Sequence, residues 1–517
     1  MSFCTVLSAT VQGLSVEMIR VEADVSNGLP MFHMVGYLSS EVKEASERVR
    51  TAIRNSGMKL PAKKIIVNLA PATVRKRGAS FDLPIALAVL AAMNYVPEEA
   101  LKGVAVIGEV SLEGKIRGVS GVLPIVMEAK NQGCTACILP EENEIEGRLV
   151  SGIKILPADN LEKLCAYLNG DEKELHRKKQ GRSSAQRNIF ENKKEDFSDI
   201  CGQNAVKRAA EIAVAGGHNL LMAGPPGSGK SMIARRIATI LPELSLEESL
   251  EITRIYSVLG MIDKEQPLIT RRPFRSVHHT ITKTALVGGG MTPRPGEISM
   301  AHGGVLFLDE LTEFPRNVLE VLRQPLEEHQ IHIARNYGNF TFPAEFMLVA
   351  AMNPCPCGNY PDMQKCSCTP SQIQKYLGKI SQPFLDRMDL CIETPKVEYR
   401  ELDIERIGKK EEESSEVIRS RVVEARKLQK KRYEGTQIRT NSMLGPGEIR
   451  TYIPLGSAER KLMEKAFERM GLTARTYHKI LRVARTIADL DYSEKVTEKH
   501  LKEAIAYRSL DKKYWGR

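Results

Sequence analysis

The sequence predicts an α/β protein with a parallel-sheet core, a smaller α+β domain before it and a helical domain after it. Short apolar runs alternate with helical patterns from residue 1 to about 170, and again from Asp199 to about Thr394. A glycine-rich loop stands between an apolar run and a helical pattern at residues 219–241. Beyond Pro395 the pattern is that of charged amphipathic helices.

The composition is that of a globular protein of about three domains. The chain has 517 residues, of which 42% are hydrophobic and 27% charged, and this excludes general disorder. The net charge of +10 is compatible with a polyanionic partner. The longest apolar run, Leu83 to Met93, is about half of the ~20 residues that a membrane span needs. Ten cysteines without an export signal favour a reducing, cytoplasmic compartment.

The first 170 residues alternate strand and helix patterns. Strands are predicted at Ile65–Leu69, Val104–Val110 and Ala136–Pro140, and helices at Glu41–Ser56 and Leu83–Met93. Residues 171–197 follow as a linker that is rich in Lys and Arg. We expect a solvated tether, and an arm that binds nucleic acid is the alternative.

The glycine-rich loop has the residues and the flanks of a phosphate-binding loop. It follows the apolar strand Asn219–Ala223 and precedes apolar residues at helical spacing. Backbone N–H groups of such a loop close around phosphate oxygens, and the helix N-terminus adds its dipole. Lys230 is expected to reach the β- and γ-phosphates, and the Ser231 hydroxyl to bind Mg²⁺. The loop residues are Gly224, Pro225, Pro226, Gly227, Ser228, Gly229, Lys230 and Ser231.

A second apolar strand ends in two acids and completes this pattern. Val305–Leu308 is apolar, and Asp309 and Glu310 follow at the strand end, where open α/β sheets bind ligands. Asp309 is expected to hold Mg²⁺ through its water shell. Glu310 is expected to polarise the attacking water. The two motifs together predict the hydrolysis of ATP.

With these motifs the sequence resembles the AAA+ ATPases and, within them, the magnesium-chelatase-like ComM/YifB family. The resemblance covers nearly the whole chain. It implies an ATPase core at residues 198–395, with a four-cysteine insertion at 355–368, and a helical lid at 396–517. The segments that carry it, besides the two phosphate motifs, run in family order: Arg272–Thr280, Ala351–Gly358, Leu385–Leu390 and Leu472–Arg475.

The resemblance also assigns roles to single residues. Gly202 and Gln203 lie in the segment that packs on the adenine, and Asn353 resembles the sensor that orients the attacking water. Arg387 resembles the arginine finger, which acts on the neighbouring subunit and so implies a closed homo-oligomeric ring, expected to be a hexamer. Arg475 resembles the lid arginine that contacts the γ-phosphate. Each arginine could instead be a surface charge.

The N-terminal domain, residues 1–170, resembles the Lon-protease/S5-like fold. Gly108–Gly118 matches the hairpin of that fold, and Ser80 falls about where its serine stands. Leu123 occupies the lysine position. Because a Ser/Lys dyad needs the lysine to deprotonate the serine, no peptidase activity is expected. A DNA-binding or ring-organising role is expected instead.

Four cysteines within fourteen residues form two Cys-x-Cys pairs: Cys355, Cys357, Cys366 and Cys368. Four thiolates suit a tetrahedral Zn²⁺, and a structural zinc site is predicted. The spacing is tighter than the usual two-residue gap, so reduced, metal-free thiols are the alternative.

Two segments are candidates for contact with DNA. Residues 330–342 alternate, turn and alternate again, which predicts a hairpin whose tip carries Arg335 and Tyr337. A buried sheet edge is the alternative. Residues 287–295 form a glycine-rich loop with one cation, Arg294, for which loop flexibility alone is the alternative. His278 and His279 are expected to point to opposite faces of a strand, in structural or nucleotide-coupled roles.

The resemblance implies an ATP-driven DNA motor that moves a branch point when incoming DNA recombines during natural transformation. Binding to DNA is expected to be independent of base sequence and to weaken steeply with salt. A magnesium-chelatase motor subunit that inserts Mg²⁺ into a tetrapyrrole is one alternative. A protein-remodelling or protease-linked machine is another. The first is disfavoured because chelatase motor subunits are expected to lack this N-terminal domain. The second is disfavoured because Leu123 stands at the lysine position.

Overall fold

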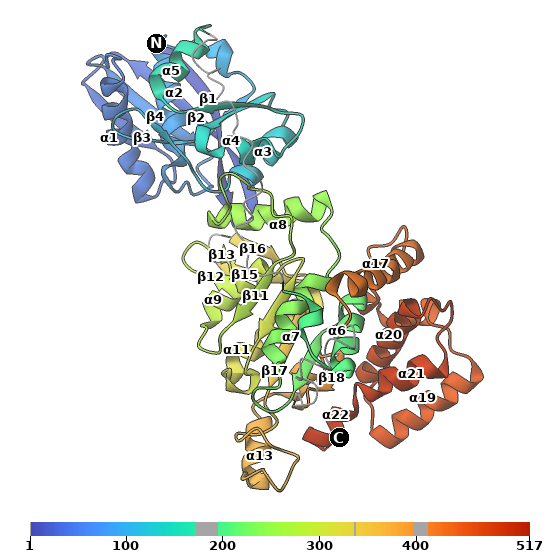
Figure 1. The fold of residues 1–517 in the computed structure, drawn as a ribbon. Helices are drawn as coiled ribbons and strands as arrows, with labels where there is room; N and C mark the ends of the chain where they lie inside the picture. The colour runs from blue at the N-terminus through green and yellow to red at the C-terminus, as the bar shows by residue number, and fades with distance from the viewer. Residues whose placement is uncertain (1, 172–194, 336–337, 397–411, 517) are drawn as a thin grey trace.

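A computed structural model of the chain describes residues 2–171, 195–335, 338–396 and 412–516. In chain order these residues form a mixed-sheet domain, a core around a parallel sheet, and a helical domain (Figure 1). This arrangement confirms the predicted fold class. Within the described ranges, no helix combines the length and the apolar character needed to cross a bilayer. Linker residues 172–194 and Tyr337 lie outside the described residues.

The N-terminal domain is built on a seven-stranded mixed sheet. Its two longest strands pair antiparallel along their whole length, whereas the last three in the order run parallel to one another. The strand order is β3 (Met31–Val35), β4 (Lys64–Ala70), β2 (Ser15–Ser26), β1 (Ser2–Gln12), β5 (Val104–Val106), β8 (Ala136–Pro140), β9 (Lys154–Ala158).

Helices cover both faces of this sheet. Successive side chains of a strand point to opposite faces of the sheet. At β5, Val104 and Val106 therefore join one hydrophobic cluster, whereas Ala105 and the following Ile107 join another. The first cluster contains α1 (Ser40–Asn55), α2 (Asp82–Ala92) and α5 (Leu161–Leu168), and the second contains α3 (Val122–Asn131).

The predicted N-terminal elements are confirmed, with one difference. The strand expected at Val104–Val110 is divided, because Gly108 turns the chain at a φ of +159°. Its second part, β6 (Glu109–Val110), pairs antiparallel with β7 (Ile116–Arg117) and forms the predicted hairpin. A short helix, α4 (Glu144–Gly147), follows β8.

The core sheet has five strands in the order β11 (Phe274–Val277), β14 (Val305–Leu308), β17 (Met347–Met352), β10 (Leu220–Ala223), β18 (Leu390–Glu393). All neighbouring pairs are parallel. Leu220 of β10 aligns with Val349 on one side and Leu390 on the other. Because parallel strands all end at the same edge, the loops after β10, β14 and β17 meet there.

Helices and two small ribbons surround this sheet. The predicted hairpin is present as β15 (Gln330–Arg335) and β16 (Gly338–Pro343), which pair antiparallel. The loop predicted at 287–295 contains a short ribbon of β12 (Gly288–Gly289) and β13 (Arg294–Pro295). The core helices are α6 (Asn204–Gly216), α7 (Lys230–Ile237), α8 (Leu246–Leu259), α9 (Lys283–Val287), α10 (Glu297–Met300), α11 (Arg316–Glu320), α12 (Arg323–Glu328), α13 (Pro370–Leu377) and α14 (Gln382–Leu385).

Helix α8 connects the N-terminal domain to the core and lies between them in Figure 1. Its Ser257 hydroxyl donates to the buried Glu146 carboxylate at 2.6 Å, and its Ser257 carbonyl accepts from the Gly121 N–H at 2.9 Å. Arg254 donates to the Leu14 carbonyl at 2.7 Å. These contacts hold the N-terminal sheet against the core through both backbone and side-chain bonds.

The C-terminal domain is helical, as predicted. Its helices α17 to α21 share one hydrophobic cluster with α6 and the core sheet, and α22 joins a second cluster of the core, so the domain packs directly on the core. The helices are α17 (Ser415–Arg432), α18 (Pro446–Tyr452), α19 (Ser457–Met470), α20 (Ala474–Leu490), α21 (Glu498–Ala506) and α22 (Ser509–Trp515).

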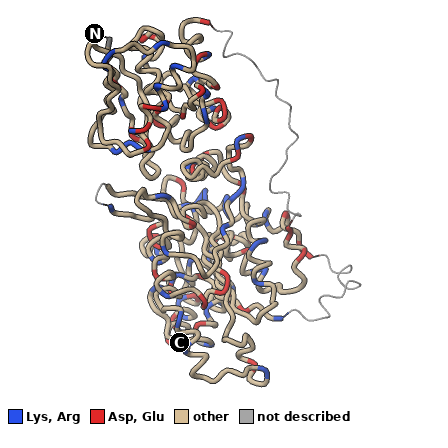
Figure 2. The backbone as a smooth tube through the Cα atoms, turned by 90° about the vertical axis from the view of Figure 1, so that its left-hand side faces the viewer, with Lys and Arg blue, Asp and Glu red and all other residues tan. Residues whose placement is uncertain are grey.

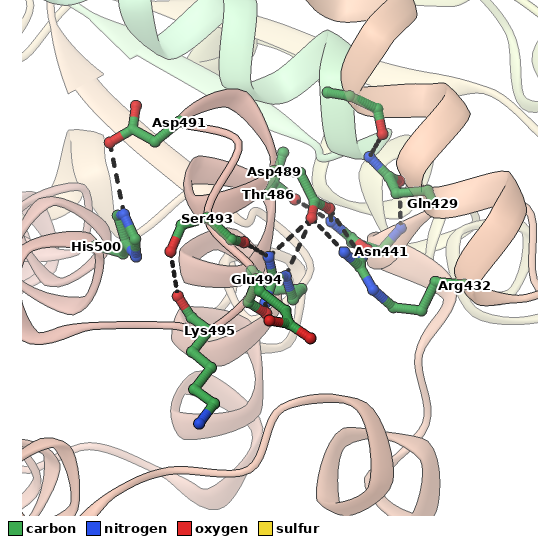
Figure 3. A network of polar contacts seen from close by, with 12 residues as sticks. Gln429, Arg432, Asn441, Thr486, Asp489, Asp491, Ser493, Glu494, Lys495 and His500 are labelled. Atoms are coloured by element: carbon green, nitrogen blue, oxygen red, sulfur yellow. Dashed lines mark hydrogen bonds and ion pairs between the residues drawn. The ribbon is translucent and has the colours of Figure 1, made fainter.

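A buried carboxylate ties the lid helices together. Asp489 on α20 is completely buried, and it accepts hydrogen bonds from Arg432 on α17, from Arg485 and from Asn441 (Figure 3). A buried charge is tolerated only when it is paired and hydrogen-bonded, and here three donors from different segments converge on one carboxylate. The network therefore fixes how α17 packs on α20.

Candidate ATP site

The phosphate loop joins the central strand β10 to helix α7. Gly227 and Gly229 have φ values of +74° and +82°, which residues with a Cβ rarely adopt. Gly224 admits no side chain either, because an added Cβ would lie 2.3 Å from the Thr394 carbonyl oxygen. The glycines of this loop are therefore required by its backbone path, which aims the N-terminus of α7 into the loop.

Lys230, the first residue of α7, lies inside this loop. Its Nζ donates to the carbonyl oxygens of Gly224 and Pro225, both at 2.8 Å, and lies 3.3 Å from the Asn353 Oδ1. Burial lowers the pKa of Lys230, and the charge of Asp309 opposes that shift. The ammonium and the predicted sensor amide of Asn353 therefore face the same small space.

The two predicted Mg²⁺ ligands also come together. The Ser231 hydroxyl donates to the Asp309 Oδ2 at 2.6 Å, although the two residues come from different strand-loop units. A hydroxyl and a carboxylate are oxygen ligands of the kind that Mg²⁺ prefers. These two residues would hold the ion, which would neutralise negative charge on the phosphate groups.

Glu310 follows Asp309 at a φ of +52°, in the left-handed region. Its side chain is more than half exposed, and its Oε2 lies 3.4 Å from the Nδ1 of His279. The expectation that His278 and His279 point to opposite faces of a strand was wrong: β11 ends at Val277, so both lie beyond the strand, and their ring centroids are 4.0 Å apart. His279 is thus a neighbour of the predicted water-polarising carboxylate.

The predicted adenine segment contacts the backbone of the phosphate loop. The Gln203 amide donates to the carbonyl oxygens of Ser228, at 2.8 Å, and Pro395, at 3.2 Å. The Gly202 N–H donates to the Glu412 carboxylate at 3.1 Å. Gln203 therefore supports the backbone of the loop, a role that the sequence pattern did not indicate.

Arg387 does not join these residues within the same chain. Its carbonyl accepts from the Asn219 side chain at 3.0 Å, and Asn219 precedes β10, whereas the phosphate loop follows it. A parallel strand rises ~3.3 Å per residue, so the four residues of β10 separate Arg387 from the loop by roughly 13 Å. Arg387 is therefore at the opposite edge of the core sheet.

Arg475 lies near Arg387. Both guanidinium groups form ion pairs with Glu327. The structure thus places the two predicted arginines together and apart from the phosphate loop. The predicted contact of Arg475 with a γ-phosphate stays a prediction.

The four cysteines form a compact cluster. The Cys355–Cys357, Cys357–Cys366 and Cys355–Cys366 sulfur atoms are 3.3, 3.5 and 3.8 Å apart, and all four ligand atoms lie within 4.8 Å of one another. Zn–S bonds of ~2.3 Å in a tetrahedron require sulfur–sulfur distances of about 3.8 Å. The donor set of Cys355, Cys357, Cys366 and Cys368 therefore fits Zn²⁺, and all ten cysteines of the chain are free of disulfides.

The cysteine loop packs against the phosphate loop. Gly358 has a φ of +78°, and a Cβ added there would lie 2.2 Å from the Pro226 Cδ. Cys355 is completely buried and follows Asn353 by two residues. The cluster is therefore next to both the phosphate loop and the predicted sensor.

The two candidate DNA segments lie side by side. The Arg335 guanidinium at the end of β15 donates to the Gly290 carbonyl at 3.4 Å, in the turn that precedes Arg294. Two residues from Gly338, which pairs with Arg335, the hairpin packs on the N-terminal domain, where a Cβ on Gly13 would lie 3.0 Å from Phe340. Tyr337, the predicted stacking residue, is outside the described ranges.

Together, the phosphate loop, the acidic strand end and the sensor strand in a five-stranded parallel sheet define an ATPase of the AAA+ class. Known families match the chain in three segments. A family described as magnesium chelatase, subunit ChlI, matches residues 196–402, and its C-terminal region matches 412–508. Subunit ChlI of Mg-chelatase matches residues 21–143.

Relatives match the whole chain. It is 44% identical to the uncharacterized protein YifB of Escherichia coli (strain K12) and 42% identical to the competence protein ComM of Haemophilus influenzae. Each alignment covers 99% of this chain and 98% of the relative. A Lon protease of Trichlorobacter lovleyi is 26% identical over 29% of this chain and 19% of its own length.

The chain belongs to the YifB/ComM family of magnesium-chelatase-like AAA+ proteins, with a ChlI/Lon-like N-terminal region. Membership implies hydrolysis of ATP with Mg²⁺. The N-terminal match itself bears the name of the chelatase subunit, so the presence of this domain does not argue against the chelatase alternative.

Proposed function

We propose that the protein is a ring-forming ATPase in which each chain completes the ATP site of its neighbour. One observation carries this proposal: the phosphate loop and the two arginines stand at opposite edges of one parallel sheet. A head-to-tail contact between identical chains brings opposite edges together and closes into a ring when the rotation allows it. A hexamer is the ring that we propose.

We propose further that the ring moves DNA, with a role in natural competence. The adjacent Arg335 and Gly290 support this, because two loops that would line one channel meet there. The printed name of the Haemophilus influenzae relative is competence protein ComM. Basic and acidic residues are interspersed along the described chain in the view of Figure 2, and we propose that local loops contact DNA.

The test is ATP-dependent movement of a synthetic four-way junction by the full-length protein, with Glu310→Gln as the inactive control. Movement that requires ATP and is lost in Glu310→Gln supports the proposal. Hydrolysis that DNA does not stimulate, without junction movement, refutes the DNA part and leaves the ATPase. Metal insertion into a tetrapyrrole by the same preparation would instead favour the chelatase alternative.

The cysteine cluster is proposed to hold one structural Zn²⁺ per chain. Bound zinc would fix the cysteine loop against Pro226, since four ligands from two short segments would be held at one point. Metal analysis of purified protein is expected to give about one zinc per chain. Absence of metal together with four freely titrating thiols would refute this assignment.

A further inference from the structure

Glu327 lies on α12, three residues before the hairpin strand β15, and no sequence motif includes it. Its Oε1 is 2.5 Å from the Arg387 Nη2 and 3.8 Å from the Arg475 Nη2. The two arginines come from different domains: Arg387 precedes the core strand β18, and Arg475 lies in the first turn of the lid helix α20. One carboxylate oxygen therefore joins the core to the lid at this edge.

The two arginines depend on this carboxylate to different degrees. The Arg387 side chain is 7% exposed and also donates to the carbonyl oxygens of Arg323 and Pro383, so packing already directs it. The Arg475 side chain is 63% exposed. A long exposed side chain has many rotamers, and fixing it costs conformational entropy. Glu327 offsets that cost and also the repulsion between two like charges.

We propose that Glu327 is a positioning residue that holds Arg387 and Arg475 together, so that both cations meet the triphosphate of the neighbouring chain as one unit. This inference rests on the proposed ring, in which the arginines act on the neighbour. Glu327 does not contact the phosphate loop of its own chain, so it acts through the arginines. Two arginines that are already held in position stabilise the negative charge that develops on the transferred phosphate in the transition state, because neither side chain has to move during the reaction.

The test compares Glu327→Gln with Glu328→Gln in the full-length protein. Glu328 is the next residue of the same helix, its side chain is similarly exposed, at 53% against 50%, and its carboxylate accepts from Gln324. Steady-state ATP hydrolysis, thermal unfolding and oligomer mass are measured for both variants. Glu327→Gln is expected to lower kcat about tenfold or more with KM for ATP within about twofold, because misplaced catalytic groups cost rate while the phosphate loop still sets affinity.

Glu328→Gln is expected to match the wild type in all three measurements. A second arm adds Glu327→Gln to Arg475→Ala: the two effects are expected to be less than additive, because Glu327 acts through Arg475. Wild-type kcat in Glu327→Gln, or equal effects of Glu327→Gln and Glu328→Gln, would overturn this inference while leaving the ATPase intact. If the wild type neither assembles nor hydrolyses ATP, the proposed ring itself fails.

Discussion

Replacing Gly358 by alanine probes the contact between the cysteine loop and the phosphate loop. Gly358 is outside both phosphate motifs, yet its added Cβ would lie 2.2 Å from the Pro226 Cδ. Ordinary van der Waals contact begins at 3.4 Å, so one of the two loops must move by more than 1 Å. We expect the phosphate loop to be displaced and the catalytic geometry to be lost.

The magnitude follows from two separate costs. Alanine at a φ of +78° costs roughly 1–2 kcal/mol of backbone strain wherever it is placed. A displacement of about 1 Å among reacting groups costs up to ~100-fold in rate. Gly57→Ala is the matched control, because Gly57 has the same φ of +78° and nothing lies within 4 Å of its added Cβ. Only Gly358→Ala should combine strain with loss of activity.

The assay measures kcat and KM for ATP hydrolysis together with the thermal unfolding midpoint. Both variants are expected to unfold at a lower temperature than the wild type. Gly57→Ala is expected to keep wild-type kinetics, whereas kcat/KM of Gly358→Ala falls by about two orders of magnitude. Wild-type kinetics in Gly358→Ala, with the expected loss of stability, would show that the cysteine loop and the phosphate loop are not coupled.

Three further predictions concern single side chains. Glu310→Gln is expected to bind ATP but to lose hydrolysis by at least ~100-fold, as measured by nucleotide binding and turnover; turnover near the wild type would exclude Glu310 as the base. Burial lowers the pKa of His218 to about 4, so stability present above pH ~6.5 is lost as pH falls toward 4, by up to ~3 kcal/mol. In urea unfolding measured across this pH range, His218→Gln should reduce the loss of stability with falling pH, and an unchanged pH dependence would show that His218 does not cause it. Asp489→Asn should cost about 3–5 kcal/mol, because the buried Arg485 and the partly buried Arg432 keep their charges without their partner; a midpoint shift within error would refute this.

The sequence predicted the parts of the site that are local in the chain. Lys230 and Ser231 follow their strand and loop directly, and Asp309 ends a second apolar strand, so pattern and chemistry coincide within a few residues. Parallel pairing of β14 and β10 through β17 then brings the two motifs to one sheet edge. Nothing beyond strand order was needed to place the Ser231 hydroxyl against Asp309.

The contacts that the sequence did not predict are tertiary. Gly358 and Pro226 are in contact although they are 132 residues apart in the sequence, and Glu327 and Arg475 are 148 residues apart. Neither pair has a spacing that could signal it. The error about His279 has a smaller cause: the strand ends two residues earlier than the histidine pattern suggested, so alternation no longer applies.

Mixing two inactive variants shows whether neighbouring chains share each ATP site. Glu310→Gln keeps its arginines, and Arg387→Ala keeps its phosphate loop and its Glu310. If the site is shared, random mixing in equal amounts completes about one seam in four, and hydrolysis is expected to return to that fraction of the wild-type rate. No recovery from two variants that fold and assemble normally would show that each chain hydrolyses ATP with its own residues alone.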